Sequence, residues 1–74
     1  MTIYDLDWQP ARLGIGFIAS CRFDDGITAY LRSENGERYN MLVDLRGDGR
    51  RTHEDLDRGR VNGLLSHYEM AHAL

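Results

Sequence analysis

The dipeptide Asn35-Gly36 lies between two segments, residues 27–33 and 38–45, in which apolar and polar residues alternate. Asn-Gly suits the two central positions of a type I′ turn, so this pattern predicts a β-hairpin. A two-residue loop would place Arg32 opposite Tyr39 and Tyr30 opposite Met41. One face of the hairpin would then carry Tyr30, Tyr39, Met41 and Val43, and the other Ile27, Ala29, Leu31 and Leu42. Both faces are partly apolar, so one is expected to cover the core and the other to be available to a partner.

Residues 2–8 show the same period of two, which predicts another half-buried strand. The alternation places Tyr4, Leu6 and Trp8 on one face and Asp5 and Asp7 on the other. Pro10 is expected to end this strand, because proline has no backbone N–H to donate to a sheet.

Residues 13–23 alternate as well and predict a longer strand. Its apolar face would carry Leu13, Ile15, Phe17, Ala19, Cys21 and Phe23, with Ile18 as the exception on the opposite face. Gly14 and Gly16 indicate a bulge or a second backbone lying close by. The run Asp24-Asp25-Gly26 that follows is typical of a turn.

The C-terminal part of the chain predicts a helix. A polar loop at residues 46–51 precedes Thr52, which is expected to cap the helix, with Asp55 three residues later in a capping-box position. Gly59 and Gly63 weaken the early turns, so the firm part of the helix is expected to start near Arg60. One stripe at helical spacing carries Val61, Leu64, Leu65, Tyr68, Ala71 and His72.

These elements predict an α+β fold: an antiparallel β-meander of three to four strands with one C-terminal helix packed on one face. Residues 1–74 are expected to form a single compact domain, because a chain of 74 residues is near the lower limit for building a core. One helix covers only one face of a sheet, so the second face is expected to stay open.

Composition excludes several classes of function. Twelve acidic residues and nine arginines, with no lysine, give a net charge of −3, which provides no overall attraction to nucleic acid or to anionic lipid. The lone Cys21 excludes an intrachain disulfide and predicts a reducing compartment. The N-terminal residues lack the pattern of a signal peptide, and no apolar run approaches the ~20 residues that span a bilayer. We therefore expect a cytoplasmic protein with no membrane partner.

The residues that carry catalysis or bind metals do not form a recognisable constellation. The window Asp44–Asp55 matches a calcium-binding loop at several positions, but Arg46 occupies a place that needs an oxygen ligand. The three histidines lie fourteen and five residues apart, which does not fit the spacing of a zinc site. Cys21 falls within an apolar alternation and is interpreted as a small buried hydrophobe. We expect no metal, no cofactor and no enzymatic activity.

The remaining hypothesis is a non-enzymatic protein–protein interaction module, a small inhibitor or regulator that binds a larger protein or complex. Aromatic residues and arginine are the commonest anchors of interfaces. The candidate partner-binding residues are Tyr30, Arg32, Tyr39 and Met41 of the hairpin and Arg50 and Arg51 of the loop after it. Another version of this hypothesis places the acidic residues Asp5, Asp7, Asp24 and Asp25 against a basic groove.

Two alternatives stay open. The five arginines between Arg46 and Arg60 could bind phosphates while an exposed tyrosine stacks on a base, although interleaved acidic residues nearly cancel their charge. The open sheet face or an edge strand could instead join two copies of the chain into a homodimer.

In its small size and acidic balance, the chain resembles the class of compact proteins that phages encode to block bacterial defence, such as anti-CRISPR proteins. The resemblance is one of class, and no individual residue is carried over by it. It implies a protein that acts without chemistry of its own, by occupying a surface of a larger bacterial complex that handles nucleic acid, for example a CRISPR–Cas complex.

Overall fold

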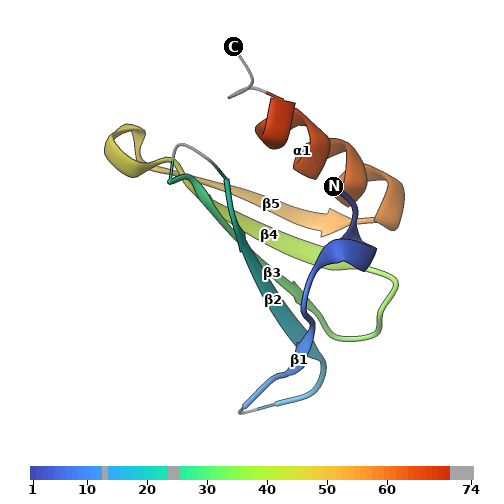
Figure 1. Ribbon diagram of the computed structural model, residues 1–74. Coiled ribbons are helices and arrows are strands. Elements are labelled where there is room, and N and C mark those ends of the chain that lie inside the picture. The colour runs from blue at the N-terminus through green and yellow to red at the C-terminus, as the bar shows by residue number, and fades with distance from the viewer. Residues whose placement is uncertain (13, 24–25, 71–74) are drawn as a thin grey trace.

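The computed structural model describes residues 1–12, 14–23 and 26–70. Their strands form one antiparallel sheet in the order β1-β2-β3-β4-β5, and one α-helix packs on one face of it (Figure 1). The elements are η1 (Ile3–Asp5), β1 (Gln9–Pro10), β2 (Phe17–Arg22), β3 (Thr28–Ser33), β4 (Tyr39–Asp44), η2 (Arg46–Asp48), β5 (Arg50–Leu56) and α1 (Arg58–Met70), where η denotes a 3₁₀-helix. The α+β meander with a C-terminal helix is confirmed, but the described residues form five strands and not three to four.

The predicted hairpin is present as β3 and β4, but its loop is longer than two residues. The Ser33 hydroxyl accepts a hydrogen bond from the Gly36 N–H at 2.8 Å and donates one to the Arg38 carbonyl at 2.8 Å. The Asn35 side-chain oxygen accepts from the backbone N–H groups of Glu37 and Arg38, both at 2.9 Å. These side-chain bonds hold residues 34–38 as the loop, so the hairpin does not close with the tight turn that Asn-Gly favours.

The longer loop shifts the register of the hairpin by one residue. Arg32 lies opposite Asn40 and Tyr30 lies opposite Leu42, not opposite Tyr39 and Met41. A shift of one residue turns every side chain of a strand to the other face of the sheet. The predicted pairing of Tyr30 with Met41 on one face is therefore wrong.

The strand predicted over residues 13–23 is observed as β2. Ala19 and Phe23 are buried and Cys21 is half-buried, in agreement with the predicted alternation. Ile15, placed on the same face by the pattern, precedes the strand and is 80% exposed. The predicted positions Leu13, Asp24 and Asp25 lie outside the described residues.

Gly16, just before β2, lies against the backbone of another strand, which is one of the two interpretations that its sequence position predicted. A Cβ atom built on Gly16 would be 2.3 Å from the Ser33 carbonyl oxygen and 2.8 Å from the Glu34 Cα. Its φ of +110° also lies in the region that favours glycine. A side chain at this position would therefore push β2 and β3 apart.

The strand predicted over residues 2–8 is wrong, because the segment begins with the short helix η1. The Thr2 N–H donates to the Asp5 carboxylate at 2.8 Å, and the Thr2 hydroxyl accepts from the Tyr4 N–H at 3.3 Å. This capping arrangement winds the backbone, so Ile3 is buried and Tyr4 is exposed. Pro10 lies in β1, on the edge of the sheet, where a missing N–H is tolerated.

Residues 50–56, predicted as a loop and the start of the helix, form the strand β5. Thr52 lies opposite Leu42 in the sheet and does not cap the helix. The cap is Asp57, whose carboxylate oxygen accepts from the Arg60 N–H at 2.8 Å. The helix therefore begins five residues later than the Thr52 cap predicts, close to the firm start expected near Arg60. Ala71 and His72 lie outside the described residues.

A β-bulge interrupts the pairing of β4 with β5. Met41 lies opposite His53 and Tyr39 lies opposite Leu56, so Glu54 and Asp55 both face Asn40. Asp55 has a φ of +54°, and its N–H donates to the Asn40 side-chain oxygen at 3.1 Å. The regular part of β5 therefore ends at Glu54.

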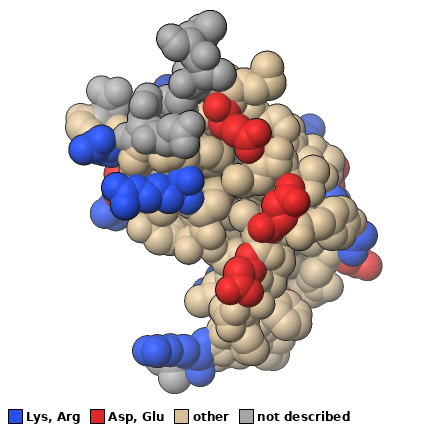
Figure 2. All heavy atoms as spheres, viewed as in Figure 1, with Lys and Arg blue, Asp and Glu red and all other residues tan. Residues whose placement is uncertain are grey.

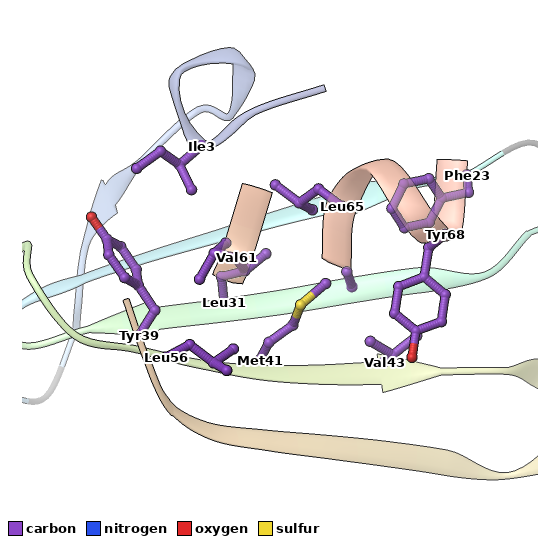
Figure 3. Close-up of a cluster of buried hydrophobic side chains, with 11 residues drawn as sticks. Ile3, Phe23, Leu31, Tyr39, Met41, Val43, Leu56, Val61, Leu65 and Tyr68 are labelled. Atoms are coloured by element: carbon purple, nitrogen blue, oxygen red, sulfur yellow. The ribbon is translucent and has the colours of Figure 1, made fainter. Parts of the chain in front are cut away.

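The core lies between α1 and one face of the sheet, which we call the inner face. Its buried residues are Ile3, Phe23, Ala29, Leu31, Tyr39, Met41, Val43, Leu56, Val61, Leu65 and Tyr68 (Figure 3). The N-terminal segment closes one end of the core, because the Ile3 N–H donates to the Asn62 side chain of α1 at 2.9 Å and the Trp8 indole donates to the Ile3 carbonyl at 2.9 Å. In the described ranges, no helix has the length and apolar character needed to cross a membrane.

Candidate interaction surface

The face of the sheet that points away from α1, here called the outer face, has no layer packed on it within the described residues. Strand alternation brings to it the side chains between those that enter the core. Arg22, Thr28, Asp44 and Arg50 form one end of this face. The side chains at its centre are Ile18 and Ser20 from β2, Tyr30 and Arg32 from β3, Asn40 and Leu42 from β4, and Thr52 and Glu54 from β5. The outer face is therefore built from four neighbouring strands.

The outer face encloses a hollow of about 620 Å³, which these side chains line together with Asp7 and Gln9. Figure 2 shows the molecule indented at the lower left, on the side of the sheet away from α1. Ile18 is 42% exposed and Tyr30 is 49% exposed, and Leu42 beside them is partly buried. The floor of the hollow is thus apolar and in contact with solvent.

The rim of the hollow carries polar groups that are free to bind. Arg32 and Asn40 are neighbours across β3 and β4. The Asn40 oxygen already accepts from the Asp55 N–H, which leaves the Asn40 amide hydrogens as donors. Within the described residues, the Arg32 guanidinium makes no hydrogen bond or ion pair. One side of the hollow therefore offers donors. The Glu54 carboxylate offers acceptors, and so does the second oxygen of Asp7, whose first oxygen accepts from the Gln9 side chain at 2.9 Å.

At the hollow, the structure exposes only two of the six residues predicted to bind a partner, while Arg50 shares the outer face but lies beyond the hollow. Tyr30 and Arg32 are exposed on the outer face. Tyr39 and Met41 are 6% and 1% exposed and belong to the core, which corrects their assignment to the binding surface. The physical reason is the shifted hairpin register. Arg50 and Arg51 lie on β5 and not in a loop; both are exposed and, as neighbours in a strand, they point to opposite faces.

Sequence reasoning missed Ile18 and Leu42 as members of the exposed surface. The sequence does contain a signal for Ile18. Ile18 lies out of phase with Ala19, Cys21 and Phe23, so its side chain has to face away from the core. Leu42 could be placed only once the hairpin register was known, since its face follows from the pairing with Tyr30.

A second, smaller hollow of about 460 Å³ lies beside the N-terminal segment. Aromatic residues line much of it: Tyr4, Trp8, Phe17 and Tyr39. The Arg58 guanidinium closes one side, where it donates to the Gly36 carbonyl at 3.1 and 3.3 Å. This bond ties the start of α1 to the hairpin loop, so the position of Arg58 is explained by the fold.

The groups that carry chemistry are dispersed over the described residues. No group of three or more histidine, cysteine, aspartate or glutamate side chains there could hold a metal ion. His53 Nε2 lies 3.3 Å from the Tyr68 hydroxyl, beneath α1. Burial raises the pKa of the Cys21 thiol, and the charge of Glu69 adds to this effect, while a backbone hydrogen bond with Ala29 opposes it. A raised pKa keeps the thiol protonated, which is unfavourable for a nucleophile.

Comparison of the chain with models of known protein families, with curated proteins and with solved structures found no match.

Proposed function

We propose that the chain is a non-enzymatic protein–protein interaction module, a small inhibitor or regulator that covers a surface of a larger protein with its outer face. The observation that supports this proposal best is the apolar hollow on an otherwise uncovered sheet face. Ile18 and Tyr30 are exposed there, and Leu42 lies partly buried beside them. Contiguous exposed apolar surface of this kind marks interaction sites in proteins that are otherwise well packed.

The composition of the outer face supports a protein partner. An interface typically has an aromatic or arginine anchor at its centre and a polar rim around it. Tyr30 and Leu42 provide the centre, and Arg32 and Asn40 provide donors at the rim. We expect a partner that inserts an apolar side chain into the hollow and presents a carboxylate to Arg32.

The nucleic-acid alternative has less support, because the arginines between Arg46 and Arg60 are spread over three elements. Arg50 and Arg51 point to opposite faces of β5, and Arg58 is bonded to the hairpin loop. Nucleic-acid binders present a concentrated basic stripe. Absence of binding to single- and double-stranded DNA and RNA at low salt is the expected result, and binding that weakens steeply with salt would favour the alternative.

The resemblance to phage proteins that block bacterial defence suggests which partners to test first. They are bacterial complexes that handle nucleic acid, CRISPR–Cas complexes among them. Purified complexes of this kind would be passed over immobilised wild-type chain, and retention of one of them at a fixed stoichiometry is the expected result.

The outer face would then be located with matched variants. Tyr30→Ala and Ile18→Ala remove the exposed apolar floor and are expected to weaken capture of the partner at least about tenfold, the effect of a modest interface anchor. Met70→Ala removes a large exposed apolar side chain from α1 and serves as the control, with capture unchanged. Equal capture by all three variants would contradict the proposal. Met41→Ala is unsuitable as a binding variant, since it would disturb the core.

A further inference from the structure

The free edge of the sheet at β5 has a feature that the outer face does not explain. Among the described residues, β5 is the last strand in the sheet order and pairs with β4 alone. Its sequence, Arg50-Arg51-Thr52-His53-Glu54-Asp55-Leu56, runs from two cations to two anions. An exposed edge strand is a template for pairing with another chain, and charges on it normally prevent that. When two copies of β5 are placed antiparallel, however, the cations of each copy lie opposite the anions of the other.

The hydrogen-bond pattern between β4 and β5 determines which backbone groups of β5 point away from β4. Next to β5, the Leu45 N–H donates to the Gly49 carbonyl at 2.8 Å. Hydrogen-bonded and non-hydrogen-bonded pairs alternate along an antiparallel ladder, so Arg51 and His53 are bonded to β4. The N–H and C=O groups of Arg50, Thr52 and Glu54 therefore point to the free edge.

We propose that β5 pairs antiparallel with β5 of a second copy of this chain, about a twofold axis at Thr52, to form a dimer with one continuous sheet. In this register Thr52 lies opposite Thr52 of the second copy, and Arg50 lies opposite Glu54 twice. All three pairs join backbone groups that point outward in both copies. Arg50 and Glu54 are exposed, and neither forms an ion pair within the described residues.

The other registers that match outward backbone groups are less favourable. A shift of two residues in one direction places Arg51 against Arg51 of the second copy, and like charges directly opposite are destabilising. The same shift in the other direction sets Arg50 opposite Leu56, which lies beyond the bulge, and it separates Arg50 from Glu54. A parallel arrangement would set Arg50 and Arg51 beside their own copies. The charge order and the bulge thus select a single pairing.

The proposal does not rest on the outer-face function, although Thr52 and Glu54 border the hollow as well. Its test reads the oligomeric state of the chain alone and so separates the two. The oligomeric state of the wild-type chain would be measured by sedimentation from micromolar to millimolar concentration at low and high salt. We expect a monomer–dimer equilibrium in which high salt favours the monomer, because the exposed pairs between Arg50 and Glu54 are screened. A monomer throughout this range at low salt would overturn the proposal.

Charge exchange tests the register. Arg50→Glu and Glu54→Arg should each abolish the dimer, and the double variant should restore it, because the opposite charges meet again. Arg51→Glu changes the net charge as Arg50→Glu does but faces the other side of the strand, and it is expected to leave the dimer intact. A dimer that tolerates Arg50→Glu, or one that Tyr30→Ala abolishes, would show that another surface joins the copies.

A backbone variant tests the pairing without charge. Thr52→Pro removes an N–H that points to solvent in the monomer, so the ladder with β4 keeps its bonds and the circular dichroism of the monomer should be unchanged. The dimer should be lost. A folded Thr52→Pro protein that dimerises like the wild type would overturn the proposal.

Discussion

At the scale of single residues, Gly16 has the strictest steric requirement of the described positions. Gly16→Ala would place a Cβ atom 2.3 Å from the Ser33 carbonyl oxygen, at a φ of +110°. Strain at such a φ costs roughly 1–3 kcal/mol, and the overlap adds to it, so the free energy of unfolding should fall by about 3 kcal/mol. Gly63 lies on α1, and a Cβ atom added there would meet nothing within 4 Å. Gly63→Ala should therefore raise the free energy of unfolding by about 0.5–1 kcal/mol. Urea denaturation of both variants measures the contrast.

Cys21 is the residue through which alkaline pH should act on stability. Burial raises the pKa of its thiol in the folded state, with a smaller contribution from Glu69. The difference between the folded and the unfolded pKa of the thiol contributes to stability. This contribution is fully present below the unfolded pKa and is lost as pH rises through the higher folded pKa. Urea denaturation from neutral to alkaline pH should therefore show a steeper loss of stability in the wild type than in Cys21→Ala. Parallel pH dependences of the two proteins would contradict this expectation.

At the scale of elements, α1 starts at a different residue from the one that the sequence pattern predicted. Asp57→Ala removes the acceptor of the Arg60 N–H and should cost about 1 kcal/mol, whereas Asp57→Asn retains an acceptor and should cost less. Thr52→Val removes the predicted cap but keeps a β-branched residue in β5, so stability should change by less than about 0.5 kcal/mol. Helix content by circular dichroism and thermal unfolding check both changes. A large loss with Thr52→Val would mean that the helix begins earlier.

The hairpin and β5 show how far local sequence patterns determine the strands. Alternation and the Asn35-Gly36 signal located both strands of the hairpin to within one or two residues. The register was missed because side-chain bonds of Ser33 and Asn35 to the loop backbone outweigh the turn preference of Asn-Gly. β5 was missed because it is an edge strand whose exposed side chains are mostly polar, so it lacks the apolar alternation of β3 and resembles a loop before a helix.

At the scale of the whole molecule, one register error misplaced two of the six predicted binding residues. Tyr30 and Arg32 are exposed, as expected, and because they lie two residues apart on one strand they share a face in any register. Tyr39 and Met41 depended on the pairing, and a shift of one residue moved them into the core. The open second face was nevertheless predictable, because a single helix cannot cover both sides of a sheet. Which residues line that face required the packed structure.

The position of the core on one face of the sheet also predicts which backbone amides exchange first with solvent. Ala29, Leu31 and Val43 are at most 2% exposed and lie on β3 and β4, which are paired on both sides, so their amides should exchange with solvent only through global unfolding. Gln9 of β1 pairs only with Ile18 at the sheet edge and should exchange at least about tenfold faster, through local fraying of the N-terminal segment. Hydrogen exchange followed by nuclear magnetic resonance in dilute solution measures both rates. Equal protection of Gln9 and Ala29 would mean that the N-terminal segment and the sheet open together, as one cooperative unit that the bonds of Ile3 to α1 hold closed.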